Sequence, residues 1–82
     1  MSATLRVGNL AQETTDDTLR TIFSDFGHVL DSAVMRDRDT GQSRGFALVT
    51  MSLAREAEAA IEGLNDTQLD GQQITVEVAN VR

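Results

Sequence analysis

Few side chains in this 82-residue sequence could take part in covalent or acid–base catalysis. Cysteine is absent, which excludes disulfides, thiolate nucleophiles and zinc sites built from cysteine. A histidine-based metal centre or a Ser–His relay is disfavoured because His28 is the single histidine. The carboxylates are scattered over predicted helix surfaces, and no nucleophile has a base beside it. We therefore expect no enzyme, no metal site and no cofactor.

Cations and aromatic rings are the remaining groups that could bind a ligand. Lysine, tyrosine and tryptophan are absent, so every positive side chain is an arginine, and the only rings are Phe23, Phe26 and Phe46. A guanidinium binds phosphate through paired N–H groups and can stack on a flat ring. The formal net charge of −6 argues against a polyanionic partner unless the charges are unevenly placed.

The length supports one domain, which we place at residues 1–82 with its core over about 4–80. No apolar run approaches the roughly 20 residues of a membrane span, and no basic and apolar leader opens the chain. We expect an intracellular protein, nuclear or cytoplasmic, with no membrane partner. Because Arg82 directly follows the last predicted strand, we also expect the domain to come from a longer protein.

Apolar spacing predicts four strands and two helices in the order βαββαβ. Thr14 and Asp17 form a capping-box-like start for the first helix, and Gly27 is expected to end it as a left-handed cap. The second helix is expected over residues 53–63. Strands are expected at 4–9, 29–36 and 44–51 and around Ile74, Val76 and Val78, with a polar loop at 37–43 and turns at 65–66 and 70–71.

Both helices carry one apolar stripe at i, i+3, i+4, i+7 spacing. The stripes are Leu19, Ile22, Phe23 and Phe26 in the first helix, and Ala57, Ala60, Ile61 and Leu64 in the second. Helices with one apolar stripe and strands with one apolar face stack as two layers. We therefore expect an α+β fold with both helices on one face of a four-stranded antiparallel sheet, with Leu19, Phe23, Val49, Ala57 and Ile61 buried. The other face is left open to solvent.

Two segments carry a family resemblance. Residues 44–51 (RGFALVTM) resemble the octamer motif of the RNA recognition motif (RRM) family, and residues 5–10 (LRVGNL) resemble its hexamer motif. They fall on the third and first predicted strands, as the family requires, and the loop at 36–43 and residues 57–64 are also similar to the family. The resemblance implies a ferredoxin-like βαββαβ sandwich with sheet order 4-1-3-2 and single-stranded RNA bound across the open face. Arg6 and Ala47 are also similar to the RRM of the g subunit of translation initiation factor three.

Strand alternation assigns side chains to the two faces of this sheet. Leu5, Val7, Ala47, Val49 and Met51 are expected to face the helices. The resemblance and the alternation together give the candidate RNA-binding residues, which are Arg6, Gly8, Asn9, Met35, Arg36, Arg38, Arg44, Phe46, Leu48, Thr50 and Glu77. Within this set Phe46, expected to be substantially exposed, would stack on a base and Arg44 would bind phosphate.

The sequence departs from the family at two platform positions. RRM proteins usually have rings at the positions of Arg6, Phe46 and Leu48, and only Phe46 is a ring here. Stacking contributes roughly 1–3 kcal/mol per base, so two missing platforms could cost about 2–6 kcal/mol. The expected helices and their turns carry nine carboxylates and two arginines, whereas the strands and their loops carry four carboxylates and five arginines. The acidity thus lies on the helical side (net −7), and the sheet side is net +1, so we expect weak RNA binding.

Several alternatives remain open at this stage. Arg6 and Glu77 could form a cross-strand ion pair, or Glu77 could accept from an exocyclic amine of cytosine or guanine. Arg36 and Arg38 could belong to a solvated loop or contact phosphate. The main alternative function is a protein-interaction domain on the same fold, which would use the acidic helices or the apolar part of the open face around Met35. The isolated domain is expected to be a monomer.

Overall fold

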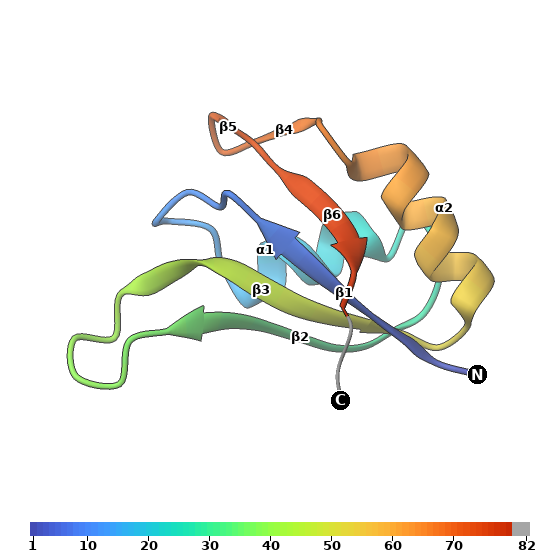
Figure 1. The fold of residues 1–82 in the computed structure, drawn as a ribbon, viewed down its shortest axis with the longest axis horizontal. Helices are drawn as coiled ribbons and strands as arrows, with labels where there is room; N and C mark the ends of the chain where they lie inside the picture. The colour runs from blue at the N-terminus through green and yellow to red at the C-terminus, as the bar shows by residue number, and fades with distance from the viewer. Residues whose placement is uncertain (80–82) are drawn as a thin grey trace.

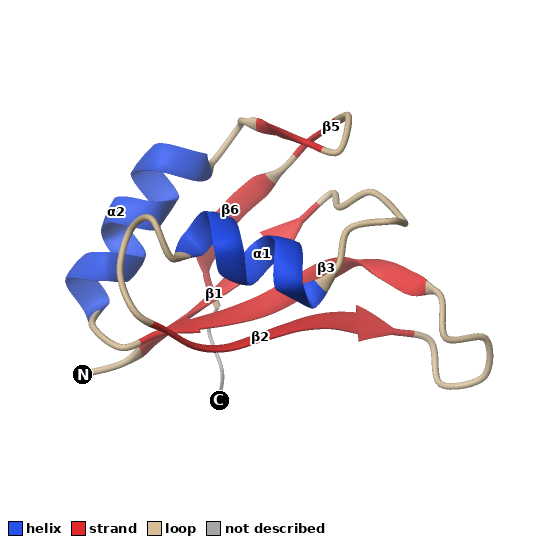
Figure 2. Ribbon diagram, turned by 180° about the vertical axis from the view of Figure 1, so that it is seen from behind, coloured by secondary structure: helices blue, strands red, loops and turns tan. Residues whose placement is uncertain are grey.

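Four antiparallel strands form the sheet, and both helices cover one of its faces (Figure 1, Figure 2). The computed structural model describes residues 1–79, so Arg82, counted above with the sheet side, lies outside the described residues. In this sheet β6 is the fourth strand along the chain. The order β2-β3-β1-β6, read from the β6 edge, therefore confirms the predicted order 4-1-3-2. The strands are β1 (Ala3–Gly8), β2 (Val29–Arg36), β3 (Ser43–Met51) and β6 (Thr75–Val78), and the helices are α1 (Asp16–Phe23) and α2 (Ala54–Leu64).

The core lies between the sheet and the helices, and strand alternation fills it. From Ala47 to Met51 every second residue of β3 is buried, and Leu5 and Val7 of β1 are buried in the same alternation. Leu19 and Phe23 of α1 pack against them and are fully buried, as predicted. Within residues 1–79 neither helix is long and apolar enough to cross a lipid bilayer.

Helix α2 approaches the sheet through two alanines. Ala57 and Ala60 are buried, whereas Ile61 is only partly buried, so the prediction that Ile61 belongs to the buried core was wrong. Small side chains let the helix lie close to the strands. The next residue, Ile61, is turned about 100° further round the helix and packs at the margin of the core. Close packing continues at Gly63, where a Cβ atom would lie 2.4 Å from Cε1 of Phe26.

Helix α1 begins one residue later and ends earlier than the sequence predicts. Thr15, not Thr14, is the N-cap, and its hydroxyl accepts from the backbone N–H of Thr18 at 3.2 Å. The helix ends at Phe23, where the Ser24 backbone N–H donates to the Arg20 carbonyl. Gly27 therefore does not cap the helix, because the last turn is already closed at Ser24.

Thr14 instead links two loops that are far apart in the sequence. Its side chain is fully buried, and its hydroxyl donates to Oδ2 of Asp70 at 2.7 Å. Asp70 and Gly71 have φ angles of +52° and +84° and join two short strands, β4 (Gln68–Leu69) and β5 (Gln72–Gln73). This geometry suits a two-residue hairpin turn, in which an Asp-Gly pair is favoured. The sequence predicted the turn but not the strands beside it.

We expect the substitution Thr14→Val to lower the free energy of unfolding by about 1–2 kcal/mol, because a buried hydroxyl that donates to a carboxylate is lost without a change in shape. Urea denaturation of the variant would measure this. Thr21→Val is the control, since the Thr21 hydroxyl donates only to a carbonyl of its own helix at the exposed surface. Equal stabilities for the two variants would contradict a stabilising link between the loops.

Candidate nucleic-acid interface

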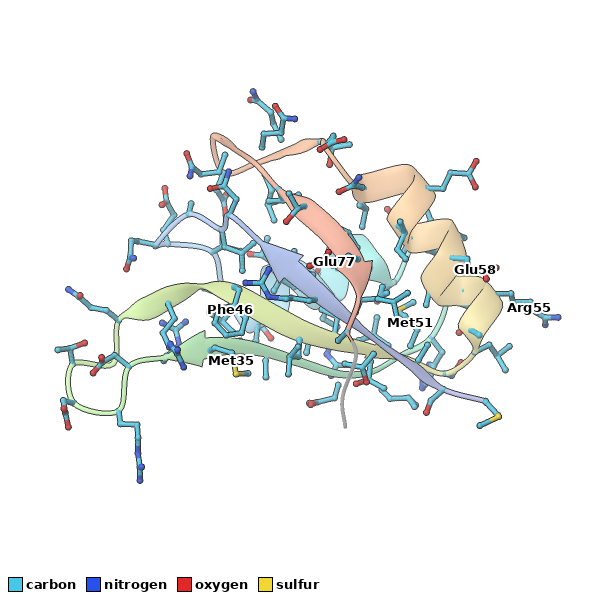
Figure 3. The ribbon with its side chains drawn as sticks, in the orientation of Figure 1. Met35, Phe46, Met51, Arg55, Glu58 and Glu77 are labelled. Atoms are coloured by element: carbon cyan, nitrogen blue, oxygen red, sulfur yellow. The ribbon has the colours of Figure 1, made fainter. Side chains whose placement is uncertain are left out.

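The sheet face that no helix covers is called here the open face. Its side chains come from alternate residues of the four strands, and the register decides which of them are neighbours. Arg6 of β1 lies directly opposite Leu48 of β3 on one side and Glu77 of β6 on the other. Figure 3 shows Met35, Phe46 and Glu77 on this face, contributed by β2, β3 and β6. No pocket opens on the surface of residues 1–79, so the open face offers an uncovered surface and no cavity.

The ring of Phe46 is the centre of the open face, and two guanidinium groups lie over it. Cζ of Arg6 is 4.8 Å from the ring centroid, and Cζ of Arg44 is 5.4 Å from it. Both distances are in the range of cation–π attraction. Phe46 is half-buried, so the prediction of a substantially exposed Phe46 was wrong in degree, because the two arginines cover part of the ring. An aromatic surface and two cations share one site.

Arg6 also contacts Glu77, as one of the sequence alternatives anticipated. Nη1 of Arg6 and Oε1 of Glu77 are 3.8 Å apart, and the two side chains are 44% and 64% exposed. At this distance and exposure an ion pair contributes little to stability. The contact shows where the Arg6 guanidinium lies, which is between the Phe46 ring and the edge strand β6.

Gly8 lies under Arg6 on β1 and is buried, so it makes room on the face but presents little surface of its own. A Cβ atom at Gly8 would lie 2.9 Å from Nη1 of Arg6 and 2.7 Å from Oγ1 of Thr75. Any larger residue would thus push the guanidinium away from its place over the strand. The sequence placed Gly8 on this face but could not show this close approach.

Asn9 directly follows β1, has a positive φ of +58° and bonds to the neighbouring hairpin. Its Nδ2 donates to the carbonyl of Gln73 at 2.7 Å, and the next residue, Leu10, donates its backbone N–H to the carbonyl of Gly45. Asparagine tolerates this left-handed conformation better than most residues. The side chain is exposed, but half of its amide is already used to hold the edge of the open face.

Further candidates on the strands of the open face are two apolar side chains, Met35 and Leu48, and the polar side chain of Thr50. Met35 and Leu48 are half-buried. Figure 3 shows Met35 beside Phe46, and Leu48 is on the same face of β3, two residues after Phe46. Oγ1 of Thr50 lies 3.1 Å from Oγ1 of Thr4, so these hydroxyls bond to each other. The sequence analysis missed Thr4, although it shares the strand parity of Arg6 and could have been assigned to the open face from that signal.

The loop between β2 and β3 holds itself in shape. The Asp37 carboxylate accepts from the backbone N–H groups of Thr40 and Asp39, and these hydrogen bonds hold the pKa of Asp37 below its usual value. Arg36 reaches the carbonyl of Gly41 through Nη1 at 3.3 Å, and Arg38 is exposed. Arg36, the last residue of β2, and Arg38 of the formed loop therefore lie at one end of the open face.

Charge on this side of the described chain is balanced, with four arginines (Arg6, Arg36, Arg38 and Arg44) and four carboxylates (Asp31, Asp37, Asp39 and Glu77). The cations are not spread evenly, because all but Arg6 lie toward the β2–β3 loop. On the opposite side, Arg55 and Glu58 of α2 point away from the sheet (Figure 3).

The comparisons with known proteins agree with this geometry. The chain is 51% identical over its whole length to glycine-rich RNA-binding protein 1 of Mycosarcoma maydis, covering 47% of that protein. It is 50% identical over 76 residues to glycine-rich RNA-binding protein GRP1A of Sinapis alba, covering 93% of this chain and 46% of that protein. The chain thus spans about half the length of these curated relatives.

Solved structures show the same fold. The crystal structure of RNA-binding protein PG1 superposes with a TM-score of 0.93 at 35% identity, covering 98% of this chain and 96% of that one. The sex-lethal protein in complex with RNA gives a TM-score of 0.87 at 38% identity, covering 94% of this chain and 47% of that one. The model of the RNA recognition motif matches residues 5–75. From its strand order, its two motifs and these matches, the chain belongs to the RNA recognition motif family.

Proposed function

We propose that the protein binds RNA and holds a few unpaired nucleotides across its open face. The observation that carries this proposal is the Phe46 ring at the centre of an uncovered sheet, with the guanidinium groups of Arg6 and Arg44 over it. A ring offers a stacking surface to any base, and guanidinium groups bind the phosphates that accompany it. The relatives named above are RNA-binding proteins, and one similar structure is an RNA complex.

Each candidate residue has a place in this proposal. Phe46 stacks on one base, Arg44 binds a phosphate, and Leu48 and Met35 contact the neighbouring bases without offering a matched plane. Arg36 and Arg38 contact phosphates that continue past the loop, while Thr50 and Glu77 offer hydrogen-bonding groups. Gly8 and Asn9 act indirectly, since the first makes room for Arg6 and the second holds the hairpin.

Binding should be weak for two reasons. One ring supplies one stacking platform, and the balanced charge of this side gives little long-range attraction for a polyanion. The two arginines over Phe46 interrupt the apolar surface that a protein partner would need, which favours RNA over the alternative of protein docking. We also propose that the protein is a monomer and acts inside the cell, in the nucleus or the cytoplasm. The narrower likeness to the g subunit of translation initiation factor three stays a prediction.

Phe46→Ala should weaken binding of a short random-sequence RNA by about 1–3 kcal/mol, because one stacked base is lost. Fluorescence anisotropy with a labelled octanucleotide would measure the affinity, and thermal unfolding would confirm that the variant is folded. Glu58→Ala on the outer side of α2 is the matched control and should leave the affinity nearly unchanged. An unaltered affinity for Phe46→Ala would remove the ring from the interface.

Arg44→Ala should make the salt dependence of binding shallower by about one unit of slope, because one phosphate contact is lost. Arg55→Ala removes the same charge from the helical side and should leave the slope unchanged. Titrations at three or more salt concentrations would give both slopes. Equal changes in the two variants would mean that net charge, and not a contact at Arg44, sets the salt dependence.

The double substitution Arg6→Tyr with Leu48→Phe should tighten binding by about 1–3 kcal/mol, the scale of one stacked base. Two new platforms would be present, but a cation and the contact between Arg6 and Glu77 would be lost. The salt dependence should become shallower for the same reason. A folded double variant with unchanged or weaker affinity would show that the open face is not the RNA platform.

A further inference from the structure

The guanidinium of Arg6 is a planar group with N–H donors on its edge, and its surroundings resemble those that a base would have. It lies over the Phe46 ring, with Cζ 4.8 Å from the centroid, and its Nη1 lies 3.8 Å from Oε1 of Glu77. The space that it fills is kept free by Gly8 below it. In the absence of RNA this site thus holds a flat group over the ring, with one donor nitrogen of that group 3.8 Å from a carboxylate oxygen.

We infer that the base stacked on Phe46 is guanine, which displaces the Arg6 guanidinium and donates to Glu77. The inference rests on the proposed function and names the base that the same site selects. The Watson–Crick edge of guanine carries the N1–H and N2–H groups side by side, which is the donor arrangement of a guanidine. A carboxylate has two oxygens that only accept, so it can pair with both of these donors.

The other three bases fit this carboxylate less well. Adenine and cytosine each place one amine donor beside a ring nitrogen that is an acceptor, so one carboxylate oxygen would face a lone pair. Uracil has a single N–H between two carbonyl oxygens, and both carbonyls would face the carboxylate. Groups that cannot pair are costly when they are brought together, which is how such a site discriminates.

Displacement of Arg6 costs little. Its contact with the ring is at an exposed site, and its ion pair with Glu77 is longer than a hydrogen bond and open to water. The side chain is long and 44% exposed, so it can turn toward solvent and keep its charge near the phosphates. Glu77 then exchanges one donor partner for another, because its carboxylate oxygens can accept from the N1–H and N2–H groups of the base.

The test uses five hexanucleotides that have uridine at every position but one. The variable position carries guanosine, adenosine, cytidine, uridine or inosine, which keeps N1–H but lacks the N2 amine. We expect the guanosine RNA to bind about 5- to 20-fold more tightly than the adenosine RNA, the lower part of the range for a bidentate base contact, since Glu77 is exposed. Inosine should lie between the two.

Glu77→Gln should reduce the ratio of guanosine to adenosine affinity to below about twofold, because an amide pairs one donor with one acceptor and loses the match to guanine. Glu58→Gln on α2 makes the same change of charge on the far side and should leave the ratio unchanged. Arg6→Ala should also leave the ratio unchanged, since the ratio is set by Glu77 and not by the displaced cation.

The outcomes separate this inference from the proposed function. If all five RNAs bind with equal affinity and Phe46→Ala weakens all of them, the open face binds RNA but does not select guanine. The inference is also wrong if the preference for guanosine persists in Glu77→Gln or disappears in Arg6→Ala. If none of the RNAs binds, both the inference and the proposed function fail.

Discussion

The register of β1 between β3 and β6 is the constraint on which the rest of the structure depends. Side chains alternate between the two faces of a strand, so a slip of one residue would turn Leu5 and Val7 toward solvent and Arg6 into the core. Burial of the first two and the cost of burying the third fix the pairing. The same pairing places Arg6 opposite both Leu48 and Glu77. The core thus determines the composition of the open face, although no residue of that face contributes much to the core.

The central contacts of the open face are individually weak, and that suits a surface that must exchange partners. The arginine–ring contacts and the exposed ion pair keep the side chains gathered in the absence of a ligand. None of them is strong enough to resist a base or a phosphate that offers comparable interactions. The firm hydrogen bonds lie at the periphery, where Asn9 holds Gln73, Thr14 holds Asp70 and Asp37 closes the β2–β3 loop. Hydrogen-bonded loops therefore surround a set of central contacts that a ligand can replace.

Most of the fold could be predicted from the sequence, because it depends on apolar periodicity and on two motifs in register. Strand order, helix positions and the facing of Arg6, Phe46 and Leu48 follow from these signals. The failures at Thr14 and Ile61 have a shared physical cause, which is that they depend on contacts between distant segments. The early end of α1, by contrast, depends on a local hydrogen bond from Ser24 to Arg20. Thr14 was assigned to a helix cap because its true partner, Asp70, is 56 residues away in the sequence and cannot be identified from local spacing. Ile61 was assigned to the core because it belongs to the apolar stripe of its helix, and the stripe does not show that α2 approaches the sheet through its alanines. The coverage of Phe46 by Arg6 likewise depends on side-chain placement across two strands, whereas Arg44 reaches the ring from two residues away on the same strand.

A chemical-shift titration of the protein with short random-sequence RNA would test most directly the claim that the open face binds RNA. The backbone signals of β1 and β3 around Arg6, Arg44 and Phe46 should move with RNA concentration, together with the guanidinium signals of the two arginines. The signals of α1 and of the outer side of α2 should stay in place. Changes confined to the helices, with the β1 and β3 signals unmoved, would contradict the account.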